Sequence, residues 1–440
     1  MKLCFKSNEI KSYYLKSDVL IYLHLLKTLI MKPLNHLKQI IIFSLFVGCI
    51  SAPKVFFEDY VDTKTRSISF QKKRIFSFVK SGVYFSNDFE GARLNNINQL
   101  NDSTYVLSIL PENKPINPSP FYAFKIWGSS SKKVFLRFKY PEGYKHRYIP
   151  KIKSNGNWKI VDSLDFKLDH NVSSLILTIN ETPKIISGQE LHTSSIIYDW
   201  VNDLAKDKEN YVRFKKIGKT KLNRPFKVLD IYKGLPKSKP VIVLLTRQHP
   251  PEVTGYFAFK AFLEAILNEN ELSSRFLDDY RVLAFPLMNP DGVDLGHWRH
   301  NAGGVDTNRD WSFYHQPEIK TTVDYIAKVL NKNNSKLLLG LDFHSTYYDV
   351  FYTNVERKST ALPEFLPKWF SSLEERISEY KVNEKPSKSK QPTSKGWFLS
   401  AHKAVGVTYE IGDDTPRDRI KLIGKESAQA MMTILINTVE

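Results

Sequence analysis

Residues that could bind and use a metal ion are spread over the second half of this 440-residue chain. His249 and Glu252 stand at a turn between a strand-like apolar run, 240–245, and a helix-like run, 253–267. A histidine nitrogen and a carboxylate oxygen so placed can point at one ion, and a catalytic zinc ion takes three such protein ligands. A surface histidine followed by a first-turn glutamate, which the helix dipole favours, has the same spacing. The four-residue match alone therefore does not decide between the two interpretations.

Two further acid–base residues end apolar, strand-like runs later in the chain. His344 follows the run that begins at Lys336, and Glu410 follows the run 405–409. Ligands of α/β sheets bind at the carboxyl ends of the strands, which is where His344 would lie. A glutamate that closes a buried strand needs a partner or a task, because an unpaired buried carboxylate is costly. The order of these residues along the chain favours one shared site.

Cationic residues that suit an anionic substrate lie between these two groups. An Asn-Pro-Asp-Gly turn at 289–292 is followed by Arg299 and then by Asn308 and Arg309. A guanidinium group is a planar fork of donors that matches a carboxylate or a developing oxyanion. Each arginine taken singly could equally be a solvated surface residue, so the argument depends on the whole series.

The complete series resembles that of the zinc metallocarboxypeptidases related to carboxypeptidase A, and the resemblance covers residues 239–440. It implies a single Zn²⁺ ion per chain, held by His249, Glu252 and His344. Water is a poor nucleophile and a peptide bond is a poor electrophile. Zinc compensates for both, because it lowers the pKa of bound water to about 7 and acts as a Lewis acid on the carbonyl.

The same resemblance implies roles for the remaining residues. Glu410 is expected to act as the general base, taking a proton from the attacking water and passing it to the leaving amine. Arg299 is expected to polarise the scissile carbonyl and stabilise its oxyanion. Asn308 and Arg309 are expected to hold the terminal carboxylate of the substrate, which would make the enzyme exo-acting.

One departure from the family concerns a tyrosine. Family members usually carry it on a mobile loop upstream of the catalytic glutamate, but this sequence has no tyrosine between residues 381 and 408. Trp397 is a candidate to cover the site without offering a phenol. Tyr347 and Tyr348 are candidates from another direction, unless they only pack in the fold.

Substrate preference depends on a lysine-rich stretch before the predicted base. In the family, the residue lining the pocket for the terminal side chain lies shortly before the position of the usual tyrosine. Lys395 is the nearest candidate here, with Lys388 and Lys390 close by. A basic pocket would favour a terminal Glu or Asp, whereas the alternative is a solvated loop.

The amino terminus, residues 1–50, has the pattern of a leader. Its apolar run, 40–50, is too short to span a membrane, which takes about 20 residues, but it suits a signal peptide. Residues 46–49 resemble a bacterial lipoprotein cleavage box, which would make Cys49 the lipidated amino terminus, and Met31 is a candidate start. We therefore expect an exported protein, periplasmic or lipid-anchored in the cell envelope. Plain cleavage without lipid, or a short buried segment, is the alternative.

Composition is that of a globular protein, with 42% hydrophobic and 25% charged residues. The net charge of +18 comes from Lys and Arg that are scattered along the chain, and no nucleic-acid-binding motif accompanies them. We expect no nucleic-acid partner. The two cysteines, Cys4 and Cys49, both lie in the predicted leader, so no disulfide is expected in the mature chain.

Residues 51–185 are rich in strand signals and predict a smaller antiparallel β-sandwich domain. The segments 85–94 and 121–127 resemble the β-sandwich that precedes the catalytic domain in the cytosolic-carboxypeptidase branch. A linker is expected over 181–194. The expected strands are 67–70, 104–109, 121–127, 133–138 and 173–179.

Residues 195–440 alternate strand-like and helix-like runs, which predicts an α/β domain. Its sheet should be mixed, mostly parallel and flanked by helices on both faces, as in the zinc carboxypeptidase fold. The expected strands are 228–231, 241–245, 282–287, 337–341 and 405–409. The expected helices are 195–204, 255–267, 317–330, 366–380 and 418–437.

The sequence therefore predicts a zinc metallocarboxypeptidase that removes a C-terminal residue from peptides with a free C-terminus. Two alternatives remain. An amidohydrolase or deacylase on the same fold would use the same ligand pattern, but the set of Arg299, Asn308 and Arg309 favours the peptidase. A catalytically silent binding lipoprotein is favoured by the missing tyrosine and opposed by the retained Glu410.

Overall fold

The computed structural model describes residues 54–169 and 172–439. The predicted leader, with Met31 and Cys49, lies outside these residues, so export and lipidation stay predictions. Residues Ile50–Glu440 form one compact unit. No helix within the described ranges is both long enough and apolar enough to cross a membrane.

The amino-terminal half of the described chain contains two facing sheets, which we call the β-sandwich part. One sheet has six strands, ordered in space as β1 (Ile75–Phe78), β2 (Val83–Ser86), β5 (Ala123–Gly128), β11 (Lys184–Ser187), β7 (Lys151–Ser154) and β8 (Asn157–Ile160). The other has five, ordered as β3 (Asn96–Gln99), β4 (Thr104–Ser108), β6 (Lys132–Lys139), β10 (Val172–Ile179) and β9 (Phe166–Asp169). Neighbouring strands are antiparallel except β4 and β6, which are parallel.

Alternating side chains explain why these strands form a sandwich. In β6, Val134, Leu136 and Phe138 are buried while the residues between them are exposed, the period-two pattern of a sheet with one covered face. Aromatic side chains from both sheets meet in the core, as where the ring of Phe85 in β2 lies 5.3 Å from that of Tyr105 in β4. The predicted antiparallel β-rich region is thus present.

The carboxyl-terminal half, which we call the α/β part, is built on an eight-stranded mixed sheet. Its spatial order is β12 (Val212–Lys219), β13 (Pro225–Ile231), β15 (Arg281–Phe285), β14 (Val241–Thr246), β16 (Leu337–Thr346), β19 (Val405–Gly412), β17 (Val350–Asn354) and β18 (Glu384–Ser387). The four central strands β15, β14, β16 and β19 are mutually parallel, as are β17 and β18. The predicted mixed, mostly parallel sheet is confirmed.

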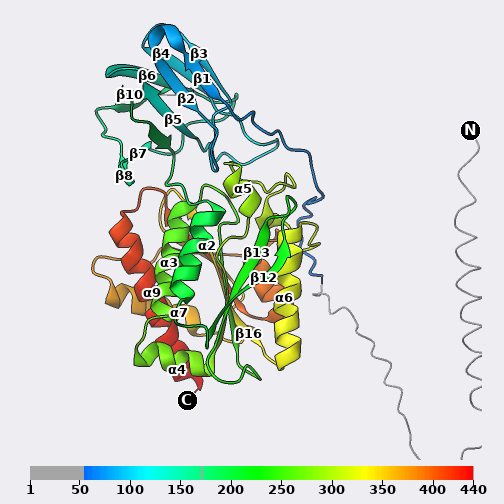
Figure 1. Ribbon diagram of the computed structural model, residues 1–440. Coiled ribbons are helices and arrows are strands. Elements are labelled where there is room, and N and C mark those ends of the chain that lie inside the picture. The colour runs from blue at the N-terminus through cyan, green and yellow to red at the C-terminus, as the bar shows by residue number, and fades with distance from the viewer. Residues whose placement is uncertain (1–53, 170–171, 440) are drawn as a thin grey trace, which may run out of the picture. The chain divides into compact units, whose positions relative to one another are not determined.

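Helices cover both faces of this sheet (Figure 1). One face packs against α2 (Ser194–Ala205), α3 (Val253–Ile266), α4 (Glu271–Asp279), α7 (Phe365–Arg376) and α9 (Arg417–Val439). The other face packs against α6 (Pro317–Asn333) and α8 (Ser394–His402). Two short elements, α5 (Pro290–Asp294) and the 3₁₀ helix η2 (Thr307–Arg309), lie in the loops at the site. A 3₁₀ turn η1 (Val79–Ser81) lies in the β-sandwich part.

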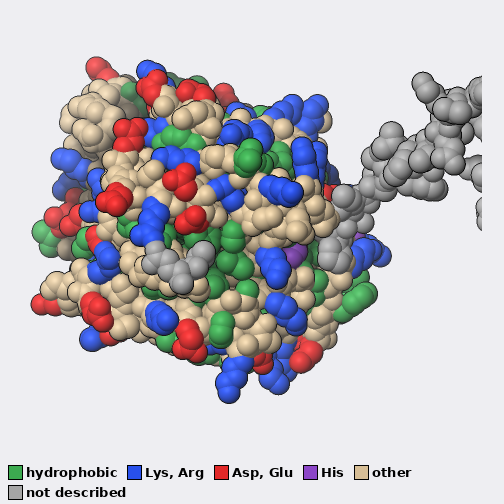
Figure 2. Space-filling model, turned by 90° about the horizontal axis from the view of Figure 1, so that it is seen from below, with side chains coloured by type: hydrophobic (Ala, Val, Ile, Leu, Met, Phe, Trp, Pro, Cys, Tyr) green, Lys and Arg blue, Asp and Glu red, His purple; other side chains and the backbone are tan. Residues whose placement is uncertain are grey.

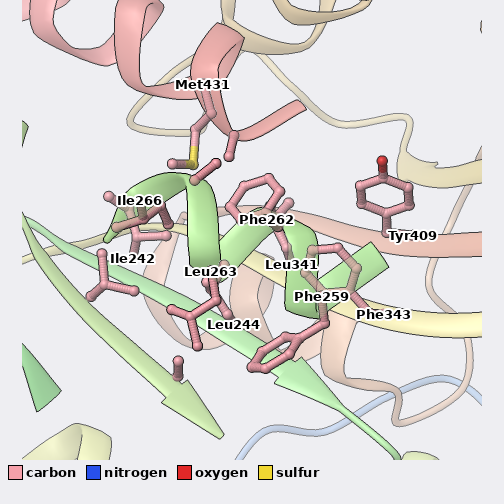
Figure 3. Close-up of a cluster of buried hydrophobic side chains, with 14 of the residues drawn as sticks. Ile242, Leu244, Phe259, Phe262, Leu263, Ile266, Leu341, Phe343, Tyr409 and Met431 are labelled. Carbon is pink, nitrogen blue, oxygen red and sulfur yellow. The ribbon is translucent and has the colours of Figure 1, made fainter. Parts of the chain in front are cut away.

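The central strand β14 shows why the fold is stable. Every residue in it is buried, because Ile242 and Leu244 face α3 and α9 while Val241, Val243 and Leu245 face α6 and α8. Figure 3 shows Ile266 and Leu263 of α3 beside Ile242 and Leu244, and Phe259 and Phe262 of the same helix beside Phe343 of β16. A parallel strand that is covered on both faces has a continuous apolar sequence, and this pattern predicted β14.

Several local features differ from the predictions. Residues 67–70 form no strand, and β11 occupies part of the segment expected to be a linker. Strands β17 and β18, which extend the sheet beyond β19, were not predicted from the sequence. Figure 2 shows basic and acidic side chains interspersed on the face it presents, in agreement with the scattered charge.

Candidate metal centre and active-site pocket

Three side chains predicted as zinc ligands converge in the α/β part. The Nδ1 atom of His249 lies 2.8 Å from Oε1 of Glu252, and the Nδ1 atom of His344 lies 2.6 Å from the other oxygen, Oε2. The two Nδ1 atoms are 3.2 Å apart. All three residues are buried, and their ligand atoms lie within 4.8 Å of one another. The structure therefore brings together three side chains that one small cation could share.

Local sequence fixes the relative position of the two segments. His249 lies in the loop after β14, and Glu252 is the N-cap residue of α3. Gly255, in the first turn of α3, packs against the strand that carries His344, where a Cβ atom would lie only 2.2 Å from the His344 carbonyl oxygen. The neighbouring Ser345 hydroxyl accepts from the Gly255 N–H at 2.9 Å. Only glycine allows the helix so close to the strand.

The opposite ring nitrogens have carboxylate partners. Nε2 of His249 lies 2.8 Å from Oδ1 of Asp306, and Nε2 of His344 lies 2.8 Å from Oδ2 of Asp342. A carboxylate beside Nε2 keeps the proton there and leaves the Nδ1 lone pair for a metal, an arrangement common at zinc sites. Two imidazole nitrogens and one carboxylate form the donor set of many catalytic zinc sites. These residues therefore fit the ion that the fold implies.

A pocket of about 290 Å³ opens over these three residues. Every residue that the sequence predicted for the site lines it, as do several that it did not predict. The predicted residues are His249, Glu252, His344, Glu410, Arg299, Asn308, Arg309 and Lys395. The others are Arg147, Ser345, Thr346, Tyr352, Ser387, Thr393 and Thr408.

Glu410 lies beside His344, because β16 and β19 are parallel and these two residues are register partners. Burial, and then the nearby charge of Glu252, raises the pKa of Glu410 to about 7. Its Oε2 atom is buried and has no hydrogen-bond partner among the described residues. A carboxylate with a raised pKa and an unpaired oxygen in a pocket is suited to accept a proton from a bound molecule.

The predicted cationic residues enter from the loops on the other side of the pocket. Arg299 Nε donates to Oδ2 of Asp306 at 2.7 Å, and its Nη1 atom lies 3.9 Å from Glu252. Arg309 donates to the carbonyl oxygen of Asn308 at 2.9 Å. The Asn308 side chain accepts from the Ser394 N–H, which anchors η2 to α8.

Lys395 is the single lysine that lines this pocket. Its side chain is buried, and its Nζ atom donates to the Thr353 carbonyl oxygen at 3.0 Å. Burial lowers the pKa of Lys395 to about 8. Lys388 and Lys390 are exposed, so the lysine-rich stretch is a solvated loop apart from the one residue at the start of α8.

The structure corrects the expectation about a covering aromatic residue. Trp397 is fully buried and donates to the Tyr314 hydroxyl, because it faces the core under α8 rather than the pocket. Tyr347 and Tyr348 are 67% and 46% exposed and do not line the pocket. The phenol in the pocket belongs to Tyr352, which pairs with Thr408 across β17 and β19. It comes from a strand that the sequence did not reveal.

Arg147 is a pocket residue from the β-sandwich part. Its guanidinium donates to Asp413 at 2.8 Å, to the Ser119 hydroxyl at 3.0 Å and to the Ser345 carbonyl oxygen at 3.2 Å. It thus lies next to the strand that carries His344. Nothing near Arg147 in the sequence suggested a site, because its role arises only when the two parts pack together.

Comparison with known proteins agrees with this geometry. A family model described as zinc carboxypeptidase matches residues 197–430. The chain belongs to this family. Cytosolic carboxypeptidase 6 of Caenorhabditis elegans is 23% identical over 333 residues, a match that covers 68% of this chain and 72% of the worm protein. In several other curated relatives the match spans less than two thirds of their length.

Solved structures of the family share the fold over both parts of the chain. A metallo-carboxypeptidase from Burkholderia cenocepacia has a TM-score of 0.68 at 14% identity, covering 81% of this chain and 100% of that protein. A metallo-carboxypeptidase from Pseudomonas aeruginosa, in complex with (2-guanidinoethylmercapto)succinic acid, has a TM-score of 0.63 at 17% identity, covering 80% and 98%. The coverage extends beyond the α/β part, so the likeness of fold to these two structures also includes much of the β-sandwich part.

Proposed function

We propose that this zinc carboxypeptidase family member hydrolyses the C-terminal peptide bond of peptides. One observation carries the proposal: the unpaired oxygen of Glu410 shares a small pocket with the three candidate ligands and with three arginines. A base, a metal-binding triad and cations around one cavity are what amide hydrolysis requires. Family membership provides the reaction class, and the pocket provides the residues for it.

His249, Glu252 and His344 would hold a zinc ion, which would supply a Lewis acid and make water acidic enough to lose a proton near neutral pH. Glu410 accepts that proton and then donates it to the departing amine. Its raised pKa suits both steps, because a group that titrates near 7 gains and loses a proton at similar cost. Burial of the triad and of the Oε2 atom of Glu410 limits competing water around the reacting atoms.

Arg299 and Arg309 would act on different oxygens of the substrate. Arg299, held at Nε by Asp306, presents its remaining nitrogens to a carbonyl oxygen whose negative charge develops during attack. Arg309, with Asn308, would hold the free terminal carboxylate. Because only the last residue of a peptide carries a free carboxylate, cleavage should be confined to the last peptide bond. An amidated terminus lacks that charge and should not be cleaved.

We also propose a preference for an acidic terminal side chain. Lys395 is buried against the pocket wall and retains donor capacity beyond its bonds to Thr353 and Ser387. An ammonium group in a largely enclosed site favours an anionic partner and penalises a cationic one.

Mass spectrometry of a peptide library with varied C-terminal residues tests the proposal directly. The zinc-loaded protein should shorten free-carboxylate peptides by one residue, act best on terminal Glu and Asp, and leave amidated copies intact. A chelator should abolish the change. Release of acyl groups without peptide shortening would favour the deacylase alternative, and binding without any product would favour the silent binder.

Export to the cell envelope is a separate proposal that rests on the leader sequence alone. Labelling of the protein with a radioactive fatty acid in a bacterial host, and its loss in Cys49→Ser, would support lipidation at that residue. A labelled Cys49→Ser variant would rule it out.

A further inference from the structure

A buried glutamate of the β-sandwich part holds the backbone of the loop that carries Arg299. Oε2 of Glu112 accepts from the Trp298 N–H at 2.8 Å. Oε1 accepts from the N–H groups of Arg299, at 3.0 Å, and His300, at 2.6 Å. Three successive backbone donors therefore converge on one fully buried carboxylate. Such a concave group of N–H donors is an anion-binding arrangement, and here a side chain of the same chain fills it.

The carboxylate is ionised in this position. Burial alone would raise the pKa of Glu112, but the nearby His297 and Arg93 side chains, together with the backbone donors, hold it below its usual value. Arg93 lies 3.4 Å from Oε2 and is itself buried. Hydrogen bonds to a charged acceptor are about twice as strong as neutral ones, so the loop is held firmly.

Other contacts fix the same loop from its flanks. The Trp298 side chain is fully buried in the core of the β-sandwich part, where its Nε1 donates to the Phe121 carbonyl oxygen at 3.0 Å. The His300 ring lies 2.7 Å from the Asn113 side-chain oxygen. The residues on both sides of Arg299 thus belong structurally to the β-sandwich part, although the sequence places them in the α/β part.

The Arg299 side chain extends from this fixed backbone towards the metal centre. Its Nε atom donates to Asp306, whose other oxygen lies 2.8 Å from His249. A continuous series of contacts therefore links Glu112, Arg299, Asp306 and His249. A shift of the backbone at Arg299 would move the guanidinium relative to the carbonyl oxygen that it is proposed to stabilise.

We propose that Glu112 is a positioning residue for catalysis, which sets the place of Arg299 from the β-sandwich part. The inference rests on the role proposed for Arg299. A misplacement of about 1 Å can cost about 100-fold in rate, because a preorganised donor must already be in place when charge develops. The β-sandwich part is then a component of the active site and not only an appended module.

Glu112→Gln in the full-length, zinc-loaded protein is the main test. It keeps the shape of the side chain but removes its charge and one acceptor. We expect kcat to fall about 10- to 100-fold while KM changes less than about threefold, with zinc content unchanged. Glu190→Gln is the matched control, because Glu190 is also buried and pairs with Arg417 at 2.9 Å through both oxygens but lines no part of the pocket.

A double-mutant cycle separates positioning from general damage. If Glu112 acts through Arg299, then Glu112→Gln should cost less than about twofold when Arg299→Ala is already present. An equal loss in both backgrounds, an equal loss in Glu190→Gln, or wild-type kcat in Glu112→Gln would overturn the proposal. Should Glu112→Gln not fold, Glu112→Asp replaces it in the test. This change keeps the charge beside Arg93 but moves the carboxylate away from the three backbone N–H groups. We expect a smaller loss of kcat, seen only in the protein that retains Arg299 and not in Arg299→Ala.

A measurement without substrate keeps this test distinct from that of the proposed function. Amide hydrogen exchange at residues 298–300 should be slow in the wild type and faster in Glu112→Gln, with α3 and β16 unaffected. If the wild type cleaved no peptide, the proposed function would fail while this exchange would still report on the loop. Unchanged exchange at 298–300 would overturn the positioning role whatever the activity.

Discussion

Oδ1 of Asp306 lies 2.8 Å from Nε2 of His249, while its other oxygen accepts from Arg299. One carboxylate therefore orients a metal ligand and a substrate-facing cation together. The charge of Arg299, together with the hydrogen bond from His249, outweighs the effect of burial and holds the pKa of Asp306 well below its usual value. This pairing motivates the first prediction.

Asp306→Asn should weaken zinc binding and slow turnover together. An amide in place of the carboxylate no longer holds the His249 proton at Nε2 and no longer attracts Arg299. Loss of such a partner typically costs about 10- to 100-fold in metal affinity or activity. Competition with a zinc-binding dye and steady-state kinetics would measure the two effects. Asp324→Asn, an acid-to-amide change on the surface of α6, is the control, and equal zinc affinity in Asp306→Asn would contradict the prediction.

The metal centre should bind about one zinc ion per chain, as expected for a site with three protein ligands. His344→Ala should lose most of this metal, because it removes one ligand nitrogen and the imidazole that lies 2.6 Å from Oε2 of Glu252. Elemental analysis of the purified proteins, before and after dialysis against a chelator, gives the stoichiometry. His402→Ala is a suitable control, since His402 lies in α8 away from the pocket. Full zinc occupancy in His344→Ala would remove this residue from the ligand set.

Glu410→Gln should retain zinc and lose nearly all turnover. The amide is close in shape to the carboxylate but cannot accept a proton from water, and general-base catalysis contributes about 100- to 10,000-fold. The measurement is kcat on the best peptide from the library, with zinc content determined on the same sample. Turnover at the wild-type rate would assign the proton transfer to another group, and Tyr352 is the phenol that lines the pocket.

Selectivity for acidic termini should depend on pH through Lys395. Burial lowers its pKa to about 8, so the ammonium form dominates below that pH and is lost above it. The ratio of kcat/KM for peptides ending in Glu and in Gln should therefore fall as the pH rises through 8. Lys395→Arg, whose guanidinium stays charged, should keep the ratio constant across the same range. A ratio in the wild type that does not change with pH would reject Lys395 as the specificity residue.

The predicted site came from residues that end long, regular elements. β14, β16 and β19 are continuous apolar runs, and parallel strands bring their carboxyl ends to one edge, so His249, His344 and Glu410 could be placed together from sequence. Asp306 carried a weak signal, since it stands two residues before Asn308 in the loop with the other polar site residues. Its partnership with His249 depends on side-chain geometry that spacing does not reveal.

Other features arise only from tertiary packing. Strand β18 has one half-buried and three exposed residues, so it lacks the alternation that would mark it, and β17 with Tyr352 was missed beside it. Trp397 stands in a polar stretch, yet α8 turns it into the core. Arg147 and Glu112 lie more than a hundred residues before the groups they contact, and no periodic pattern relates positions so far apart.

The indole of Trp298 is buried in the core of the β-sandwich part, although Trp298 follows α5 of the α/β part in the sequence. This contact restricts how the two parts can be exchanged between related genes. A β-sandwich taken from another family member would need a cavity of the same depth to accommodate that ring. We therefore expect the β-sandwich part and the α/β part to be inherited together, with substitutions around the Trp298 ring matched by substitutions in the loop that carries it.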